Sequence, residues 1–240
     1  LRLATEVGIL ELPPVVHLFS LLAVVSMVTG NVLALLQENV KRLLAYSSIA
    51  HFGYVLVALL AGGPPAAEAV TFYVIVYCAM SIGAFGVVTV YSSEGGEKDR
   101  VEDYQGLFWT RPWLAGMLAL SLLSLAGIPV TAGFIGKFYA ITAVVDAGLW
   151  WLVLALIGNS VVSLYYYLRL IVTLFGEVAV QATLPQQETP QRSEFVSWTA
   201  VCSLGFVASI ILVLGVYPEP LIQLIRESVS NLLIVVAQRP

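Results

Sequence analysis

The sequence predicts an all-α membrane protein: a polytopic bundle of about six transmembrane helices, one of them discontinuous, followed by a C-terminal interfacial helix. Apolar residues form 59% of the chain and charged residues only 11%, and the mean hydropathy is +0.92. A soluble protein does not reach these averages, so lipid must be part of the solvent. Apolar runs of roughly 20 residues, the length that spans a bilayer as a helix, recur between short polar segments.

Six apolar runs follow one another along the chain. We expect the transmembrane segments at Val15–Gln37, Arg42–Ala61, Ala69–Ser92, Pro112–Val145, Leu149–Phe175 and Phe195–Tyr217. Lys and Arg gather in alternate loops, beside residues 41–42, 98–111 and 169–192, which places these loops on the cytoplasmic side.

The first residues resemble the end of a helix. Leu1–Leu12 lacks the basic and then apolar layout of a signal peptide. We therefore expect residues 1–240 to form a single membrane domain that is the C-terminal part of a longer subunit, with the N-terminal half missing.

The fourth segment is too long for one straight crossing. Pro112–Val145 would extend about 51 Å as a helix, whereas the hydrocarbon core is about 30 Å thick. Pro129 cannot donate a backbone hydrogen bond, and Gly127, Gly133 and Gly136 flank it. We expect a discontinuous helix here, because broken backbone at membrane depth is typical of ion sites in transporters.

The C-terminal tail has an amphipathic pattern. In Pro220–Val236, apolar residues recur at helical spacing, and Arg226 and Glu227 lie between them. An interfacial helix and a partly ordered terminus are both compatible with this pattern.

Lys137 is the most informative residue of the sequence. It lies inside the long fourth segment, and the nearest acidic residue along the chain is Asp146. A lysine at the centre of a membrane helix costs about 2.5 to 3.5 kcal/mol, so its presence indicates a functional site. Desolvation makes such an amine a candidate for reversible protonation. The alternative is a side chain that extends to the membrane interface.

His51 is a second candidate proton carrier. It lies near the centre of the second segment, with Ser47 and Tyr54 on the same helical face. Histidine can pass a proton between its two ring nitrogens, which suits a relay. The alternative is a neutral packing histidine, and we assign no role to His17, which begins the first segment.

Other polar residues recur at helical spacing. They could hold waters for a relay, or they could be hydrogen-bonding contacts between helices. The residues are Tyr73, Tyr77 and Ser81 in the third segment and Asn159, Ser163 and Tyr167 in the fifth. Lys41 begins the second segment and is either a charge that sets the orientation or a group that takes up protons.

Several classes of function are disfavoured by the composition. Cys78 and Cys202 lie in separate apolar runs and are expected to be packing thiols, with no metal-binding spacing. There is no nucleotide-binding motif and no basic run that would indicate nucleic-acid binding. We therefore expect neither a metal nor a cofactor on this chain.

Six stretches together resemble one family, subunit N of bacterial NADH:quinone oxidoreductase (complex I), a relative of mitochondrial subunit 2. The resemblance covers nearly the whole chain. The stretches are Gly30–Gln37, Asn39–Tyr54, Asp103–Trp109, Leu125–Pro129, Thr131–Tyr139 and Tyr165–Arg169. The second is shared across antiporter-like proteins, whereas its combination with the third, fifth and sixth is specific to subunit N.

The resemblance implies a proton-translocating subunit with fourteen helices, of which this chain holds roughly the last six. Lys137 falls on the lysine of the broken twelfth helix and His51 on the tenth helix. The family's glutamate on helix five and lysines on helices seven and eight have no counterpart here.

The resemblance also implies the surroundings of the chain. NADH, FMN, iron–sulfur clusters and quinone would be bound by other subunits, the partners would be neighbouring antiporter-like membrane subunits, and the location would be a bacterial plasma membrane. Two alternatives stay open: a subunit of a cation/proton antiporter or membrane-bound hydrogenase, and a structural scaffold in which Lys137 and His51 are paired and never titrate.

Overall fold

The computed structural model describes residues 12–93, 97–177 and 198–237. Within these ranges the chain is helical and contains no strand, which confirms the predicted all-α class. The helices are α2 (Pro13–Leu35), α3 (Val40–Leu60), α4 (Gly63–Ser93), η2 (Val101–Tyr104), α5 (Leu107–Thr110), α6 (Pro112–Ala126), α7 (Ala132–Asp146), α8 (Trp150–Phe175), α9 (Trp198–Val216) and α10 (Glu219–Ala237). The expected helix end at Leu1–Leu12 falls almost entirely outside the described residues.

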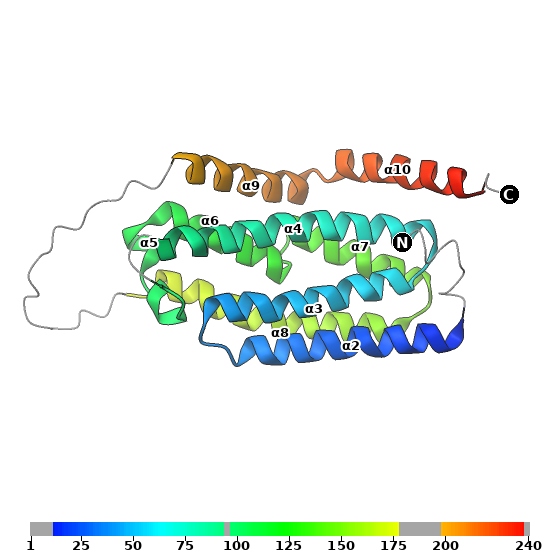
Figure 1. The fold of residues 1–240 in the computed structure, drawn as a ribbon, viewed down its shortest axis with the longest axis horizontal. Coiled ribbons are helices and arrows are strands. Elements are labelled where there is room, and N and C mark those ends of the chain that lie inside the picture. Colours follow the sequence, from blue (N-terminus) through cyan, green and yellow to red (C-terminus); the bar gives the residue numbers. More distant parts are fainter. Residues whose placement is uncertain (1–11, 94–96, 178–197, 238–240) are drawn as a thin grey trace, which may run out of the picture.

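The long helices form one bundle, as Figure 1 shows. Helices α2, α3, α4 and α8 run alongside one another, α6 and α7 follow each other along the bundle, and α9 and α10 cover one side. Among the described residues, α2, α3, α4, α8 and α9 are long and apolar enough to cross a membrane, and α6 is a shorter apolar helix. The predicted polytopic helix bundle is therefore confirmed.

Helix α4 starts earlier than the sequence indicated. It begins at Gly63, ahead of the expected Ala69, because Pro64 and Pro65 occupy its first turn. Prolines are tolerated there, since the first backbone N–H groups of a helix have no partner within the helix. Helix α3 has a side-chain cap, because Asn39 accepts a 3.0 Å hydrogen bond from the backbone N–H of Arg42.

The predicted break in the fourth segment lies between α6 and α7. Gly127 ends α6 in the left-handed conformation, with φ of 82°, and its N–H bonds the carbonyls of Leu123 and Ser124. A turn follows, in which the N–H of Thr131 donates to the carbonyl of Ile128 at 3.3 Å. Val130 has φ of 74° in this turn, a position that favours glycine.

Two other predicted glycines allow close packing around the break. The N–H of Gly133 donates to the Ser124 hydroxyl at 3.0 Å, and a Cβ on Gly133 would collide with the Ser124 backbone carbonyl. A Cβ on Gly136 would lie 3.2 Å from the ring of Tyr73. These glycines therefore bring the start of α7 against α6 and α4.

The segment at the predicted cytoplasmic end contains two short helices that the sequence did not reveal. In this segment Tyr104 is fully buried, and its hydroxyl donates to the Lys98 carbonyl at 3.2 Å. The indole of Trp109 donates to the carbonyl of Phe175 at 3.3 Å, which ties α5 to the end of α8. Lys41 forms a 2.6 Å ion pair with Asp99.

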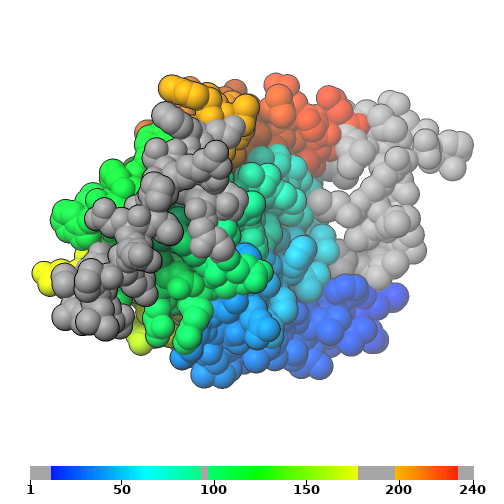
Figure 2. All heavy atoms as spheres, turned by 60° about the vertical axis from the view of Figure 1, so that its left-hand side comes forward, coloured from blue at the N-terminus to red at the C-terminus, as the bar shows by residue number. Residues whose placement is uncertain are grey.

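Helix α10 packs along α4, and Figure 2 shows its red surface against the blue-green surface of α4. Ile222 and Ile225 of α10 are buried in the core. Arg226 forms a 3.4 Å ion pair with Glu68 of α4. The tail is therefore helical, and its location at the membrane interface stays a prediction.

One expectation about packing is wrong. Cys78 and Cys202 are exposed on the outside of the bundle and are not buried thiols. In a membrane protein an apolar helix can face lipid as well as the core, so an apolar run does not indicate burial.

Candidate functional site

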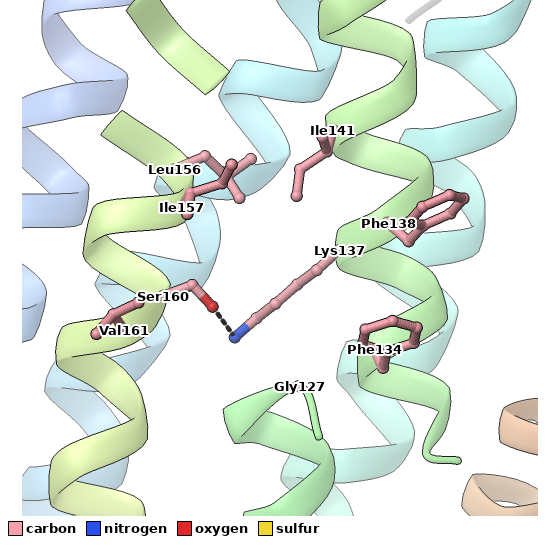
Figure 3. A pocket seen from close by; sticks show the side chains of 9 residues that line it. All are labelled: Gly127, Phe134, Lys137, Phe138, Ile141, Leu156, Ile157, Ser160 and Val161. Atoms are coloured by element: carbon pink, nitrogen blue, oxygen red, sulfur yellow. Dashed lines mark hydrogen bonds between the residues drawn. The ribbon is translucent and has the colours of Figure 1, made fainter. Parts of the chain in front are cut away.

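Lys137 lies on α7, and its amine lies inside the bundle. The residue is 5% exposed. Its Nζ donates to the carbonyls of Leu125 and Ala126 at 3.1 and 2.9 Å and to the hydroxyl of Ser160 at 3.0 Å. Figure 3 shows the side chain extending from α7 towards Ser160 on α8. This geometry argues against the alternative in which the side chain extends to the membrane interface.

The helix break supplies the acceptors for this amine. In a continuous helix the Leu125 carbonyl would accept from residue 129, but residue 129 is proline and has no N–H. The Ala126 carbonyl also lies in the last turn of α6, where helix carbonyls lack partners and carry partial negative charge. The sequence that breaks the helix therefore also supplies two hydrogen-bond acceptors for the Lys137 amine.

The amine stands beside a small cleft between α7 and α8. Its volume is about 180 Å³. The lining residues, labelled in Figure 3, are Gly127, Phe134, Lys137, Phe138, Ile141, Leu156, Ile157, Ser160 and Val161. Phe138, Ile157 and Val161 are exposed, so the outer rim of the cleft reaches the surface of the described chain.

His51 lies on α3 and is bonded through both ring nitrogens. Nδ1 lies 2.9 Å from the hydroxyl of Tyr73, and Nε2 lies 3.3 Å from that of Tyr167. The imidazole is 1% exposed and stacks on the ring of Tyr77, with centroids 4.9 Å apart. A tyrosine hydroxyl can donate or accept, so either tautomer of His51 can be accommodated, as a relay requires.

Tyr54 contacts both candidate carriers. Its ring centroid lies 5.4 Å from Lys137 Nζ and 5.5 Å from the ring of His51, which it meets edge to face. The structure thus brings Lys137, His51, Tyr54, Tyr77 and Tyr167 into one interior region.

The hydroxyls of Ser47 and Ser163 are also buried, and they donate to the backbone carbonyls of Leu44 and Ser160 respectively. Ser47 also interacts with the Tyr167 hydroxyl, and Ser163 with the Tyr54 hydroxyl. Ser81, another residue of the predicted stripes, is partly exposed.

Lys41 is remote from this interior. Its side chain is 38% exposed at the end of α3, paired with Asp99. His17, to which the sequence assigned no role, is exposed at the start of α2.

Three residues of the site, Asn31, Ser160 and Tyr166, were not predicted from the sequence. Asn31 bonds Tyr54, Asn159 and Tyr166, and Ser160 binds the Lys137 amine. An asparagine inside an apolar span is itself a signal of a structural or functional contact, and this signal could have identified Asn31. The role of Ser160 depends on which helix faces Lys137, and helical periodicity does not reveal that.

The charge of this interior is unusual. Among the described residues, Lys137 is the one buried Lys, Arg, Asp or Glu side chain, so no buried carboxylate neutralises it. Within the same residues, no group of three or more His, Cys, Asp or Glu side chains could hold a metal ion.

Comparisons with known proteins identify the family to which this chain belongs. Residues 3–163 match the family described as NADH:quinone oxidoreductase/Mrp antiporter, TM. The chain is 47% identical over 218 residues to NADH-quinone oxidoreductase subunit N of Ectopseudomonas mendocina (strain ymp), a match that covers 88% of this chain and 42% of that protein. The chain thus spans less than half the length of this curated relative.

Two solved structures share the fold. A chain of respiratory complex I from Thermus thermophilus is 33% identical, with a TM-score of 0.68 over 88% of this chain and 45% of that chain. A chain of the membrane-bound sulfane sulfur reductase, an archaeal respiratory membrane complex, is 27% identical, with a TM-score of 0.78 over 93% of this chain and 44% of that chain. With its apolar spans and the match over residues 3–163, the chain belongs to the NADH:quinone oxidoreductase/Mrp antiporter family of integral membrane proteins.

Proposed function

We propose that this chain is the proton-conducting C-terminal part of subunit N of a respiratory NADH:quinone oxidoreductase, and that it couples electron transfer elsewhere in the complex to proton movement through the membrane. Lys137 binds and releases the proton, and His51 relays it with the tyrosines around it. The 47% identity to a curated subunit N supports this assignment over other members of the family.

The observation that supports proton carriage most strongly is the binding of the Lys137 amine to three neutral oxygens. A protonated amine has three hydrogens to donate and fills all three acceptors. The charged form is costly, because none of the described buried residues is a carboxylate that could neutralise it. The neutral amine avoids this cost. The site therefore accommodates both protonation states, which a reversible carrier needs.

The remainder of the proposal concerns the complex. NADH, FMN, iron–sulfur clusters and quinone are bound by other subunits, and this chain binds no redox cofactor. Its partners are other membrane subunits, in particular neighbouring antiporter-like subunits, and the lipid of a bacterial plasma membrane. Lys41 is a charge that sets the orientation of the chain, and a role in proton uptake is the alternative.

The proposal is tested by replacing Lys137 in the intact, reconstituted complex. We expect Lys137→Ala and Lys137→Arg both to lower the number of protons pumped per electron, since alanine cannot carry a proton and arginine does not release one. Lys98→Ala is the matched control, because Lys98 lies in the segment at the predicted cytoplasmic end, outside the interior site. Normal pumping per electron in both Lys137 variants would overturn the proposal.

A second candidate is a subunit of a cation/proton antiporter or of a membrane-bound hydrogenase. The observation that favours it is the TM-score of 0.78 with the sulfane sulfur reductase chain, which exceeds the 0.68 with the complex I chain. Purification of the full-length protein with its bound partners separates the two. The peripheral subunits that bind NADH would copurify only with a complex I subunit.

The scaffold alternative requires Lys137 and His51 to be paired. The structure gives them separate partners, because the Lys137 amine bonds two carbonyls and Ser160, whereas His51 bonds Tyr73 and Tyr167. A scaffold would also leave pumping per electron unchanged in the Lys137→Arg complex.

A further inference from the structure

The side chain of Asn31 joins three helices at the centre of the bundle. It comes from α2 and is 1% exposed. Its Nδ2 lies 3.3 Å from the hydroxyl of Tyr54 on α3, and its Oδ1 accepts a 2.9 Å hydrogen bond from Tyr166 on α8. Nδ2 also lies 3.1 and 3.2 Å from the backbone and side-chain oxygens of Asn159 on α8.

The amide nitrogen of Asn31 has more acceptors than hydrogens. It faces three oxygens, one on Tyr54 and two on Asn159, but carries two hydrogens. Asn31 can therefore release the Tyr54 hydroxyl and still donate both hydrogens to Asn159. The restraint on Tyr54 is reversible without leaving a buried donor unsatisfied.

Tyr54 stands where the two candidate proton carriers approach one another. Its ring contacts both the Lys137 amine and the His51 imidazole. Among the described residues, no hydrogen bond runs from Lys137 or the Ser160 hydroxyl to the side chain of Tyr54 or His51. The Tyr54 hydroxyl, the one group of that side chain able to pass a proton, is bound by Asn31 and also interacts with the Ser163 hydroxyl.

We propose that Asn31 is a positioning residue of the proton site: by binding the Tyr54 hydroxyl, it keeps Tyr54 from completing a hydrogen-bonded path between Lys137 and His51. This inference rests on the proposed function. Release of Tyr54 from Asn31 connects the two carriers, so Asn31 limits proton passage to the moments when the site rearranges. Loss of Asn31 should then produce a proton leak.

The test uses the complete complex reconstituted in liposomes that contain a pH-sensitive dye. Passive proton entry under an imposed potential is measured without NADH, and protons pumped per electron are measured with it. Asn31→Leu should raise the passive leak about threefold, the factor that corresponds to one hydrogen bond between membrane helices. Protons pumped per electron should fall, while the rate of electron transfer is kept.

Two further variants identify the bond responsible. Tyr54→Phe deletes only the hydroxyl that Asn31 holds, so we expect its complex to pump fewer protons per electron without the leak, because no hydroxyl remains to complete the path. Tyr166→Phe removes a different side-chain partner of Asn31, the donor to its Oδ1, and leaves the Tyr54 bond, so its leak should equal that of the unmodified complex. In the double variant Asn31→Leu/Lys137→Ala the leak should disappear, because the path includes Lys137.

An unchanged leak in Asn31→Leu, or an equal leak in Tyr166→Phe, would overturn the inference. If Asn31→Leu fails to assemble, Asn31→Ser and Asn31→Ala, which are smaller, replace it in the same measurement, and if none of the three assembles, the role is structural and the inference is overturned. The proposed function fails separately, through normal pumping in the Lys137→Ala and Lys137→Arg complexes.

Discussion

Gly127 leaves the space that the Lys137 side chain occupies. A Cβ on Gly127 would lie 2.8 Å from Cδ and 3.2 Å from Nζ of Lys137, and Gly127 also has φ of 82°. We expect Gly127→Ala to displace the amine from its three acceptors and to lower pumping per electron in the reconstituted complex. The added overpacking should destabilise the site by about 1 to 3 kcal/mol.

Gly148→Ala is the matched control for this substitution. Gly148 has φ of 73°, but a Cβ there meets nothing within 4 Å. It therefore reproduces the backbone strain of about 1 to 2 kcal/mol without the contact to Lys137. Equal losses of pumping in the two variants would show that strain, and not the position of Lys137, is responsible.

His51 should be needed for proton transfer and not for assembly. We expect His51→Gln to reduce the rate of proton pumping about tenfold or more, because glutamine keeps hydrogen bonding to tyrosine hydroxyls but cannot carry a proton. His17→Gln, at the exposed start of α2, is the control and should pump normally. Full pumping in the His51→Gln complex would show that His51 is a packing residue.

Tyr104 should make the predicted cytoplasmic end sensitive to alkaline pH. Burial, and next the charge of Asp99, raise the pKa of Tyr104 above that of an exposed tyrosine. Because the folded-state pKa is the higher one, the neutral side chain contributes stability that is complete below about pH 10 and is lost as the pH rises further.

The comparison of unmodified and Tyr104→Phe complexes tests this dependence. At about pH 8 the unmodified complex should melt at the higher temperature, because only it forms the hydrogen bond from Tyr104 to the Lys98 carbonyl. The difference should shrink above about pH 10, since phenylalanine does not ionise. A difference in melting temperature that stays constant as the pH rises would contradict the raised pKa of Tyr104.

Lys41 should affect stability at low salt and not the pumping ratio. It forms a surface ion pair with Asp99 at 2.6 Å. We expect Lys41→Ala to leave protons pumped per electron unchanged, and to lower the melting temperature by an amount that high salt abolishes. A reduced ratio in this variant would instead support a role for Lys41 in proton uptake.

The sequence predicts most of the fold for one physical reason, which is that a bilayer requires long apolar helices. Apolar runs indicate the lengths of these helices, and prolines and glycines indicate where they break. The discontinuity around Pro129 follows from its missing N–H. The short helices near Tyr104 and Trp109 were not predictable, because they depend on tertiary bonds to Lys98 and Phe175.

The candidate site was predictable only in part. Lys137 and His51 stand out because ionisable groups are rare inside membranes. Whether Ser160 and Tyr166 face the site depends on how α8 is rotated relative to α7 and α2. Helical periodicity alone does not determine this rotation. The burial expected for Cys78 was wrong, because lipid-facing and core-facing positions are equally apolar in a membrane helix.

The most direct measurement of the central claim is infrared difference spectroscopy of the complex during turnover, with lysine labelled with ¹⁵N. If Lys137 binds and releases a proton, a lysine NH₃⁺ band should appear and disappear with turnover, shift with the label and be absent from the Lys137→Gln complex. A spectrum in which no lysine band changes during turnover, although protons are pumped, would contradict the account.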